Sequence, residues 1–210
     1  MAATKQNLRK YYTAVRKRIP PADAERLSFG VAANAISILR LRGAELILAY
    51  HKLGSEADTA HLVEFIIGSG LGAALPYCRD DGSMGIGRIF NPRFDLQRGP
   101  QGAMEPIGRL KDNVTPAQLD AVVCPGVVFD ESGARIGRGG GYYDRFLRTL
   151  KDGGAFKIGY AFDCQISKTP LPKEEYDVAM DAVVTEKRAF PAGCCPAIIA
   201  PAGEEIGGGR

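Results

Sequence analysis

The sequence contains no tryptophan, only two histidines and five cysteines in 210 residues. No two cysteines form a C-x-x-C pair, so a structural zinc site lacks ligands at a plausible spacing. An odd cysteine count, without a secretory signal or a disulfide-rich composition, is typical of the reducing cytosol. No apolar run approaches the roughly 20 residues that a membrane span needs. We therefore expect a cytoplasmic protein that does not enter a membrane.

The overall composition is that of an ordinary globular domain. Hydrophobic residues make up 45% of the chain and charged residues 24%, and the net charge is only +3. The basic excess is local, because the chain from Lys5 to Arg18 carries Lys and Arg residues and no acid before Asp23. Such a segment is compatible with a transit peptide or with an arm that binds nucleic acid. Composition alone leaves both open.

The most informative segment is Arg135-Ile-Gly-Arg-Gly-Gly-Gly-Tyr-Tyr-Asp144. Four of the five positions in 137–141 are glycine, and glycine permits positive φ angles and a close approach of backbone N–H groups to an anion. Arg135 and Arg138 add forked cationic donors that suit phosphate oxygens. A helix predicted over 142–150 begins directly afterwards, and its first N–H groups also favour an anion. The segment predicts a loop that holds a polyphosphate.

This loop matches neither of the two common nucleotide-binding fingerprints. A G-x-G-x-x-G pattern that begins at Gly137 would need glycine at the position of Tyr142, and no G-x-x-x-x-G-K-[S/T] motif occurs. A bare glycine triplet is also typical of a flexible surface loop. The flanking arginines, aromatic residues and carboxylate favour the phosphate-binding interpretation.

Apolar periodicity and turn residues divide the chain into alternating helices and strands. We expect helices over 4–18, 22–41, from Asp58 or Thr59 onward, and over 142–150. We expect strands over 45–50, 73–77, 84–90, 120–124, 157–162 and 182–185, a hairpin over 127–136, and mostly loop over 91–115. This alternation predicts an α/β fold around a largely parallel central sheet flanked by helices. In such sheets ligands gather at the carboxyl ends of the strands, where the glycine loop lies.

Four segments, in order along the chain, resemble the 5-formyltetrahydrofolate cyclo-ligase family, also called 5,10-methenyltetrahydrofolate synthetase. They are Lys5-Gln-Asn-Leu-Arg9, Tyr50-His-Lys-Leu-Gly-Ser-Glu-Ala-Asp-Thr59, the segment from Pro125 to Leu147, and the segment from Tyr176 to Glu186. The resemblance implies a three-layer single α/β domain over residues 1–186 and a monomer. We expect residues 187–210, rich in Pro, Ala and Gly, to form a flexible tail. Cleavage of a transit peptide would remove Lys5 and Arg9, so we disfavour that alternative.

The resemblance also implies a reaction: ATP-driven closure of 5-formyltetrahydrofolate to 5,10-methenyltetrahydrofolate, with release of ADP and phosphate and a requirement for Mg²⁺. The N5-formyl oxygen attacks the γ-phosphorus of ATP, and N10 then attacks the formyl carbon as phosphate departs. Such a reaction needs no enzyme nucleophile, and catalysis is mainly positioning and charge neutralisation. The residues agree, because arginines and glycines dominate the main motif and no nucleophile–histidine–carboxylate constellation is visible.

Residue by residue, the resemblance assigns ATP binding mainly to the glycine loop and the first helix. Lys5 and Arg9, one turn apart, resemble a phosphate-binding pair, although a solvated basic face is the plain alternative. We expect Arg138 and Tyr143 to act in catalysis. The full set expected to bind ATP is Lys5, Arg9, Arg135, Gly137, Arg138, Gly139, Gly140, Gly141, Tyr142 and Tyr143.

The same resemblance assigns folate binding to His51, Glu56, Met84, Tyr142 and Tyr143. A carboxylate such as Glu56 can accept paired hydrogen bonds from pterin N–H groups, and an aromatic ring can stack on a pterin. The alternatives are ordinary: His51 can cap a strand end, Met84 can fill the core, and the two tyrosines can be packing residues.

Asp144 and Asp177 match positions linked to Mg²⁺, which prefers carboxylate and phosphate oxygens. Asp181 is the alternative ligand, and Asp144 could instead be a first-turn helix acid. Two positions depart from the family pattern. Gln101 stands where an aromatic residue is usual, which puts one folate-stacking contact in doubt, and Tyr176 replaces a frequent histidine.

We weighed two other functions. The first is a nucleotide- or RNA-binding module that keeps the fold without catalysis, which the basic residues 5–18 suggest. An RNA binder needs no acid set such as Glu56, Asp144 and Asp177, and the usual RNA-stacking motifs are absent, so we expect no nucleic-acid partner. The second is an ATP-dependent ligase or kinase that acts on another pterin or a small amide.

Overall fold

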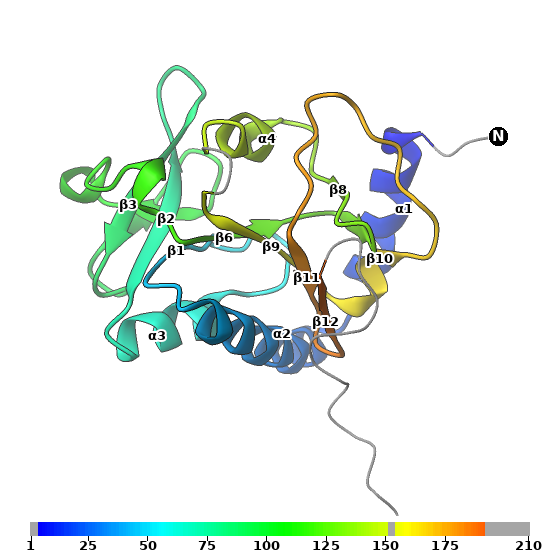
Figure 1. Cartoon of the computed structure of the whole chain (residues 1–210), viewed down its shortest axis with the longest axis horizontal. Helices are drawn as coiled ribbons and strands as arrows, with labels where there is room; N and C mark the ends of the chain where they lie inside the picture. The colour runs from blue at the N-terminus through cyan, green and yellow to red at the C-terminus, as the bar shows by residue number, and fades with distance from the viewer. Residues whose placement is uncertain (1–3, 151–153, 192–210) are drawn as a thin grey trace, which may run out of the picture.

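A seven-stranded sheet forms the centre of the protein (Figure 1). The computed structural model describes residues 4–150 and 154–191. The strands, in spatial order, are β12 (Ala189–Pro191), β11 (Ala182–Val184), β9 (Phe156–Tyr160), β6 (Ala121–Pro125), β1 (Leu46–Leu48), β2 (Gly72–Cys78) and β3 (Met84–Ile89). Neighbours from β11 to β2 run parallel, whereas β3 and β12 pair antiparallel at the edges. The largely parallel sheet predicted from the sequence is confirmed.

Helices cover both faces of this sheet (Figure 1). The helices α2 (Pro21–Arg42) and α3 (Ala60–Gly68) lie on one face, and α4 (Tyr142–Leu147) lies on the other. The first helix, α1 (Lys5–Lys17), lies beside a small sheet of β7 (Val128–Asp130), β8 (Arg135–Ile136) and β10 (Ile166–Ser167). The three-layer α/β architecture is thus confirmed. Among the described residues, no helix is long and apolar enough to span a membrane.

The central strands are apolar on both faces because each face packs against helices. In β1, Ile47 packs into the cluster formed with α2 and α3, whereas Leu48 packs into the cluster on the α4 side, and both are fully buried. Val123 and Val122 of β6 divide in the same way. The alternation follows from the two-residue period of a strand. A strand with polar residues on one face would be destabilising at the centre of this sheet, because both faces are buried.

The helix boundaries follow from local signals. The hydroxyl of Thr4 accepts a hydrogen bond from the N–H of Asn7 at 3.2 Å, which caps α1. Pro21 starts α2, where its missing N–H costs nothing, and Gly43 ends that helix in the left-handed region at φ 61°.

Three stretches differ from the sequence-based expectation. The helix after the glycine loop ends at Leu147, so it is shorter than the predicted 142–150. Residues 91–115, expected to be mostly loop, contain β4 (Leu96–Arg98) and β5 (Met104–Pro106), paired antiparallel. The short 3₁₀ helices η1 (Gly108–Leu110), η2 (Pro116–Gln118) and η3 (Asp163–Gln165) complete the fold.

The third difference concerns the end of the domain. The sheet continues past the expected boundary at residue 186, because β12 pairs with β11 and buries Ala189. Cross-strand hydrogen bonds therefore order a segment that looked like the start of a tail. The rest of the tail expected over 187–210 lies outside the described residues from 192 onward.

The sheet order places a crevice at its middle. After β1 the chain adds β2 on one side, and later β6 pairs with β1 on the other side. The loops that leave the carboxyl ends of β1 and β6 therefore diverge. In open α/β sheets such a switch point is where ligands bind.

Candidate active site

A cavity of about 750 Å³ lies where the loops after β1 and β6 meet the glycine loop. Its wall also includes the start of α1, the β4–β5 hairpin and the segment 174–177. The predicted site residues that line it are Lys5, Arg9, His51, Glu56, Met84, Arg135, Gly137, Arg138, Gly139, Gly140, Gly141, Tyr142, Tyr143, Asp144 and Asp177. The structure thus brings together the residues assigned to ATP, folate and metal. Which of them bind each ligand stays a prediction.

The glycine loop connects β8 to α4 along one side of the cavity. Gly139 and Gly141 adopt φ angles of 107° and 67°, which residues with a Cβ rarely reach. The Nε of Arg9 donates to the carbonyl of Gly137 at 2.9 Å, which ties α1 to this loop. The sequence motif attributes these glycines to the close approach of a ligand. Their positive φ angles show that the backbone of the loop also requires glycine at these two positions.

Arg135 is part of the cavity wall and is not a free cation. Its side chain is 3% exposed, and Nη2 donates to Oδ1 of Asp144 at 2.6 Å. Nη1 donates to the carbonyl of Pro125 at 3.3 Å, and Nε is buried without a hydrogen-bond partner among the described residues. These contacts hold Asp144 in place. Arg135 is thus better suited to orienting this carboxylate than to moving with a bound phosphate.

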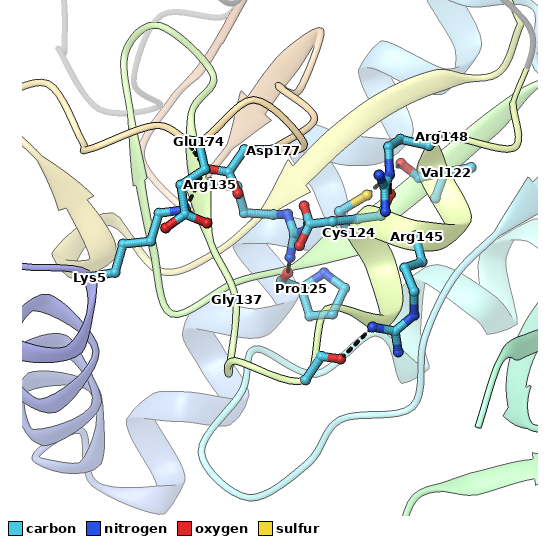
Figure 2. A network of polar contacts seen from close by, with 12 residues as sticks. Lys5, Val122, Cys124, Pro125, Arg135, Gly137, Arg145, Arg148, Glu174 and Asp177 are labelled. Atoms are coloured by element: carbon cyan, nitrogen blue, oxygen red, sulfur yellow. Dashed lines mark hydrogen bonds and ion pairs between the residues drawn. The ribbon is translucent and has the colours of Figure 1, made fainter.

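Lys5 projects from the start of α1 toward two acids of the segment 174–177 (Figure 2). Its Nζ lies 2.5 Å from Oδ2 of Asp177 and 3.2 Å from Oε2 of Glu174. Burial alone would raise the pKa of Asp177, but the hydrogen bonds from Lys5 and from the N–H of Glu174 hold it below its usual range. A phosphate that recruits Lys5 must therefore compete with two carboxylates.

Glu56 is a buried carboxylate in the cavity wall. Its residue is only 7% exposed, and Oε2 accepts a hydrogen bond from the N–H of Leu53 at 2.9 Å. Burial raises the pKa of Glu56, and the Leu53 N–H and the charges of Arg16 and Arg138 partly oppose that effect. Nη1 of Arg138 lies 3.7 Å from Oε1 of Glu56, although the Arg138 side chain is 57% exposed.

The two tyrosines that follow the glycine loop have different surroundings. The hydroxyl of Tyr143 is buried and has no hydrogen-bond partner among the described residues, and burial raises its pKa well above the usual range. An unpaired buried hydroxyl is costly, so a ligand that supplies a partner gains from it. Tyr142 instead carries the guanidinium of Arg145 over its ring, at 5.1 Å from the centroid.

Two weaker assignments, His51 and Met84, and the two departures from the family pattern, Gln101 and Tyr176, also line the cavity. His51 follows β1 and has Nδ1 3.2 Å from the carbonyl of Lys52, and Met84 begins β3 half-buried. Gln101 lies on the β4–β5 turn, where its Nε2 contacts Sγ of Cys78 at 3.6 Å. Tyr176 is 54% exposed at the rim.

Sequence reasoning missed several residues of the cavity wall. Arg145 and Arg148 add two cations, and Glu174 adds an acid beside Lys5. Glu105 of β5 is buried and accepts a hydrogen bond from the N–H of Cys78 at 3.2 Å. The positions of Arg145 and Arg148 directly after the glycine segment were a usable signal. Glu174 gave none, because long-range packing brings it beside Lys5.

Asp181, the alternative metal ligand, is not part of the cavity wall. It precedes β11 and therefore lies at the amino end of a strand, whereas the cavity lies at the carboxyl ends. Its Oδ2 accepts hydrogen bonds from the backbone N–H of Lys157 at 2.7 Å and lies 2.8 Å from Nζ of that residue. Asp181 thus makes structural contacts outside the cavity, which favours Asp177 over Asp181 as the predicted metal ligand.

A profile of the 5-formyltetrahydrofolate cyclo-ligase family matches residues 1–186 of the chain. The chain belongs to this family. It is 28% identical to the 5-formyltetrahydrofolate cyclo-ligase of Escherichia coli K12 over 176 residues, which cover 83% of this chain and 96% of that protein. It is 29% identical to the 5-formyltetrahydrofolate cyclo-ligase of Mycolicibacterium smegmatis over 201 residues, which cover 90% and 97%.

Two solved structures extend the comparison to three dimensions. The NMR structure of Aquifex aeolicus 5,10-methenyltetrahydrofolate synthetase superposes with a TM-score of 0.77 at 29% identity, over 93% of this chain and 96% of that one. A 5,10-methenyltetrahydrofolate synthetase from Mycoplasma pneumoniae shares the fold, with a TM-score of 0.68 at 21% identity, over 87% and 99%. The family membership therefore agrees with the architecture.

Proposed function

We propose that this chain catalyses the ATP-dependent cyclisation of 5-formyltetrahydrofolate to 5,10-methenyltetrahydrofolate, with release of ADP and phosphate. Membership of the cyclo-ligase family supports the proposal. The observation that carries it is the contact between Arg138 and Glu56, at 3.7 Å. Through it, a loop suited to phosphate and a carboxylate suited to pterin N–H groups share one cavity. Transfer of a phosphoryl group from ATP to the folate requires the two binding sites to be adjacent.

The proposed nucleotide site combines the glycine loop with the cations around it. Arg138 is the exposed arginine of the loop and can follow the charge that develops on a transferring phosphoryl group. Lys5 and Arg9 lie on α1 next to the loop. Binding is expected to involve re-pairing, because these residues already contact Asp177 and the carbonyl of Gly137, respectively.

The proposed folate site lies around Glu56 and Tyr143. Two pterin donors can bind to the Glu56 carboxylate, and the unpaired hydroxyl of Tyr143 can donate to or accept from the substrate. Together they would orient the formyl oxygen toward the γ-phosphorus. The oxygen forms a bond to phosphorus as ADP leaves. N10 then attacks the formyl carbon, loses its proton, and phosphate leaves with the formyl oxygen.

The acids of the cavity fit a Mg²⁺ ion held together with the nucleotide. Asp144 and Asp177 each use one oxygen for the contacts described above, and within residues 4–150 and 154–191 the other oxygen has no hydrogen-bond partner. Mg²⁺ takes one or two carboxylates plus phosphate oxygens and water. When bound, the ion would neutralise charge on the phosphates. The protein residues would position it and keep Lys5 and Arg135 close by.

An absorbance assay for methenyltetrahydrofolate tests the proposal. Purified protein is mixed with ATP, Mg²⁺ and 5-formyltetrahydrofolate, separately and together, and we expect product only with all three. Product without ATP would contradict the cyclo-ligase reaction, and so would no product under any condition. We also expect a cytoplasmic monomer, which fractionation and light scattering would check.

A further inference from the structure

Arg16 is the residue of α1 whose burial stands out. It lies near the end of the helix, and its residue is only 5% exposed, whereas the other residues of α1 are half-buried or exposed. A buried guanidinium is expensive unless its donors and its charge are compensated. No motif of the sequence assigned a function to this side chain. Its surroundings therefore need an explanation.

The guanidinium of Arg16 joins the two loops that diverge at the switch point. Its Nε donates to Oγ of Ser55 at 3.1 Å, in the loop after β1, and Nη1 donates to the carbonyl of Gly126 at 3.0 Å, directly after β6. The carbonyl of Gly126 also accepts from Nε2 of Gln165 at 2.9 Å. Ser55 directly precedes Glu56, so Arg16 holds the segment that carries the buried carboxylate.

Arg16 also supplies charge to Glu56. The pKa of Glu56 is raised chiefly by burial, and of the two arginines that oppose this, Arg16 has the larger effect. Reciprocally, burial lowers the pKa of Arg16, and Glu56 is the charged group that opposes this most. Arg138 forms an ion pair with Glu56, but its side chain is largely exposed. Water screens an exposed charge more than a buried one, which explains why Arg138 lowers the pKa of Glu56 less than Arg16 does.

The titratable groups whose charges interact with Glu56 come from four elements. Arg16 belongs to α1, Arg138 to the glycine loop, Tyr143 to α4, and Tyr50 follows β1. The two tyrosines are buried and have raised pKa values, chiefly through desolvation, so they are neutral at physiological pH. The two arginines are therefore the cations that balance Glu56 in its ionised form.

The helix thereby contacts three segments around the cavity along one stripe. Lys5, Arg9 and Arg16 lie at i, i+4 and i+11 and reach Asp177, the glycine loop and the loop of Glu56, respectively. At 1.5 Å per residue, Lys5 and Arg16 are separated by about 16 Å along the axis. A rigid helix of this length links the proposed phosphate and folate sites.

We propose that Arg16 is a positioning residue for folate recognition: it fixes the loop that carries Glu56 and is the buried countercharge of that carboxylate. The assignment of Glu56 to folate rests on the proposed function. Arg16 itself need not touch either substrate. The competing explanation is that Arg16 only ties the backbone together, independently of the charge on Glu56.

A double-mutant cycle between Arg16 and Glu56 separates these explanations. Equilibrium binding of 5-formyltetrahydrofolate and of ATP is measured for Arg16→Met, Glu56→Gln and the double variant. We expect Arg16→Met to weaken folate binding about tenfold and ATP binding less than about twofold, and to add less than about threefold in the Glu56→Gln background. Lys157→Met, which removes a cation paired with an acid outside the cavity, is the control and should leave both affinities unchanged.

A conservative variant keeps the test valid if Arg16→Met does not fold. Arg16→Lys keeps the charge but loses the fork that reaches both Ser55 and Gly126. It should lose part of the folate affinity, and this loss should again shrink in the Glu56→Gln background. Equal losses in both backgrounds would overturn the proposal. So would an equal loss of ATP affinity.

The pH dependence of unfolding gives a readout that needs no substrate. A carboxyl with a raised folded-state pKa destabilises the folded state above its unfolded pKa, and the cost grows as pH rises toward the folded value. Removing Arg16 raises the pKa of Glu56 further. The destabilisation by Arg16→Met, or by Arg16→Lys to a smaller extent, should thus be larger at pH 7 than at pH 4.

The same unfolding measurements in the Glu56→Gln background complete the test. There the extra loss at pH 7 should disappear, because the titrating carboxyl is gone. A loss that is equal at both pH values in the Glu56 background would overturn the charge coupling. Failure of the proposed function would look different: wild-type protein would form no methenyltetrahydrofolate, while the unfolding cycle would still report the coupling between Arg16 and Glu56.

Discussion

The two arginines of the glycine segment form opposite kinds of ion pair with the cavity acids. In Arg135–Asp144 the cation is buried, with 3% of its side chain exposed against 24% for the acid, and the atoms are 2.6 Å apart. In Arg138–Glu56 the acid is buried, at 6% against 57% for the cation, and the separation is 3.7 Å. One pair has a fixed cation and an accessible acid, and the other has the reverse.

The difference suggests different tasks for residues that look equivalent in the sequence. A buried guanidinium with good hydrogen bonds is held in one place, so Arg135 orients Asp144 toward the cavity. An exposed guanidinium at 3.7 Å can leave its partner at little cost. This difference fits the proposed function, in which Arg138 moves to a phosphate while Glu56 stays in place to bind the folate.

The largest expected effect is on stability and comes from Arg135→Met. Removing the buried cation leaves the carboxylate of Asp144 and the carbonyl of Pro125 without their donor, so the free energy of unfolding should fall by about 3 kcal/mol. Urea unfolding measures this. The matched control is Arg138→Met, which should change the free energy of unfolding by less than about 0.5 kcal/mol. Equal stability of the two variants would show that the pairs do not differ.

The second effect is on turnover and comes from Arg138→Ala. Turnover should fall about 10²-fold if the guanidinium contacts developing charge on the phosphoryl group. Arg138→Lys should recover only part, because the forked geometry is lost. Steady-state kinetics with varied ATP measure both. Wild-type ATP kinetics in Arg138→Ala would mean that the loop is structural.

The third effect tests the buried acid of the second pair. Glu56→Gln replaces an acceptor-only carboxylate with an amide that cannot match two donors, so KM for 5-formyltetrahydrofolate should rise about tenfold. ATP binding, measured alone, should stay within about twofold. If ATP binding fell and folate binding did not, Glu56 would belong to the other site. Equal damage to both would indicate a folding defect, which a thermal melt detects.

The pH dependence of folate binding sharpens this prediction. Because burial raises the pKa of Glu56, its ionised form is lost at a higher pH than for an ordinary carboxyl. Folate affinity in the wild-type protein should fall as pH decreases through that raised value. The Glu56→Gln variant should lack this acid limb. An identical limb in both proteins would assign the titration to the substrate or to another group.

The smallest effect concerns the cations of α1. Lys5→Ala combined with Arg9→Ala should weaken ATP binding several-fold, because Lys5 must first leave Asp177 and Glu174. The remaining affinity should depend less on salt, because two screened attractions are gone. Titrations at two ionic strengths measure this, with Lys157→Ala as the control outside the cavity. Weaker folate binding with unchanged ATP binding would reverse the assignment.

Much of the fold could be predicted from local sequence patterns. The buried strands around Ile47 and Val122 are nearly continuous apolar runs, and Pro21 and Gly43 mark the ends of α2. The strands β4, β5, β10 and β12 were missed. Each has only two or three residues and exists because a partner strand supplies hydrogen bonds, so no periodic pattern announces it.

The candidate site was predictable as a set of residues but not as a set of contacts. The glycine segment, Glu56 and the N-terminal cations were found from motifs, and they line one cavity. The burial of Arg16 and the pairing of Lys5 with Glu174 were not foreseen. Both features depend on contacts between segments that are far apart along the chain.

The sequence by itself determined the local chemistry of this protein. Glycines at 139 and 141 permit the positive φ angles of the loop, and the spacing of Lys5, Arg9 and Arg16 places three cations on one helical stripe. Only the tertiary structure decided which arginine is buried and which carboxylate each one meets. Burial and pairing depend on the order of the strands and on the packing of distant segments, and no local pattern encodes either.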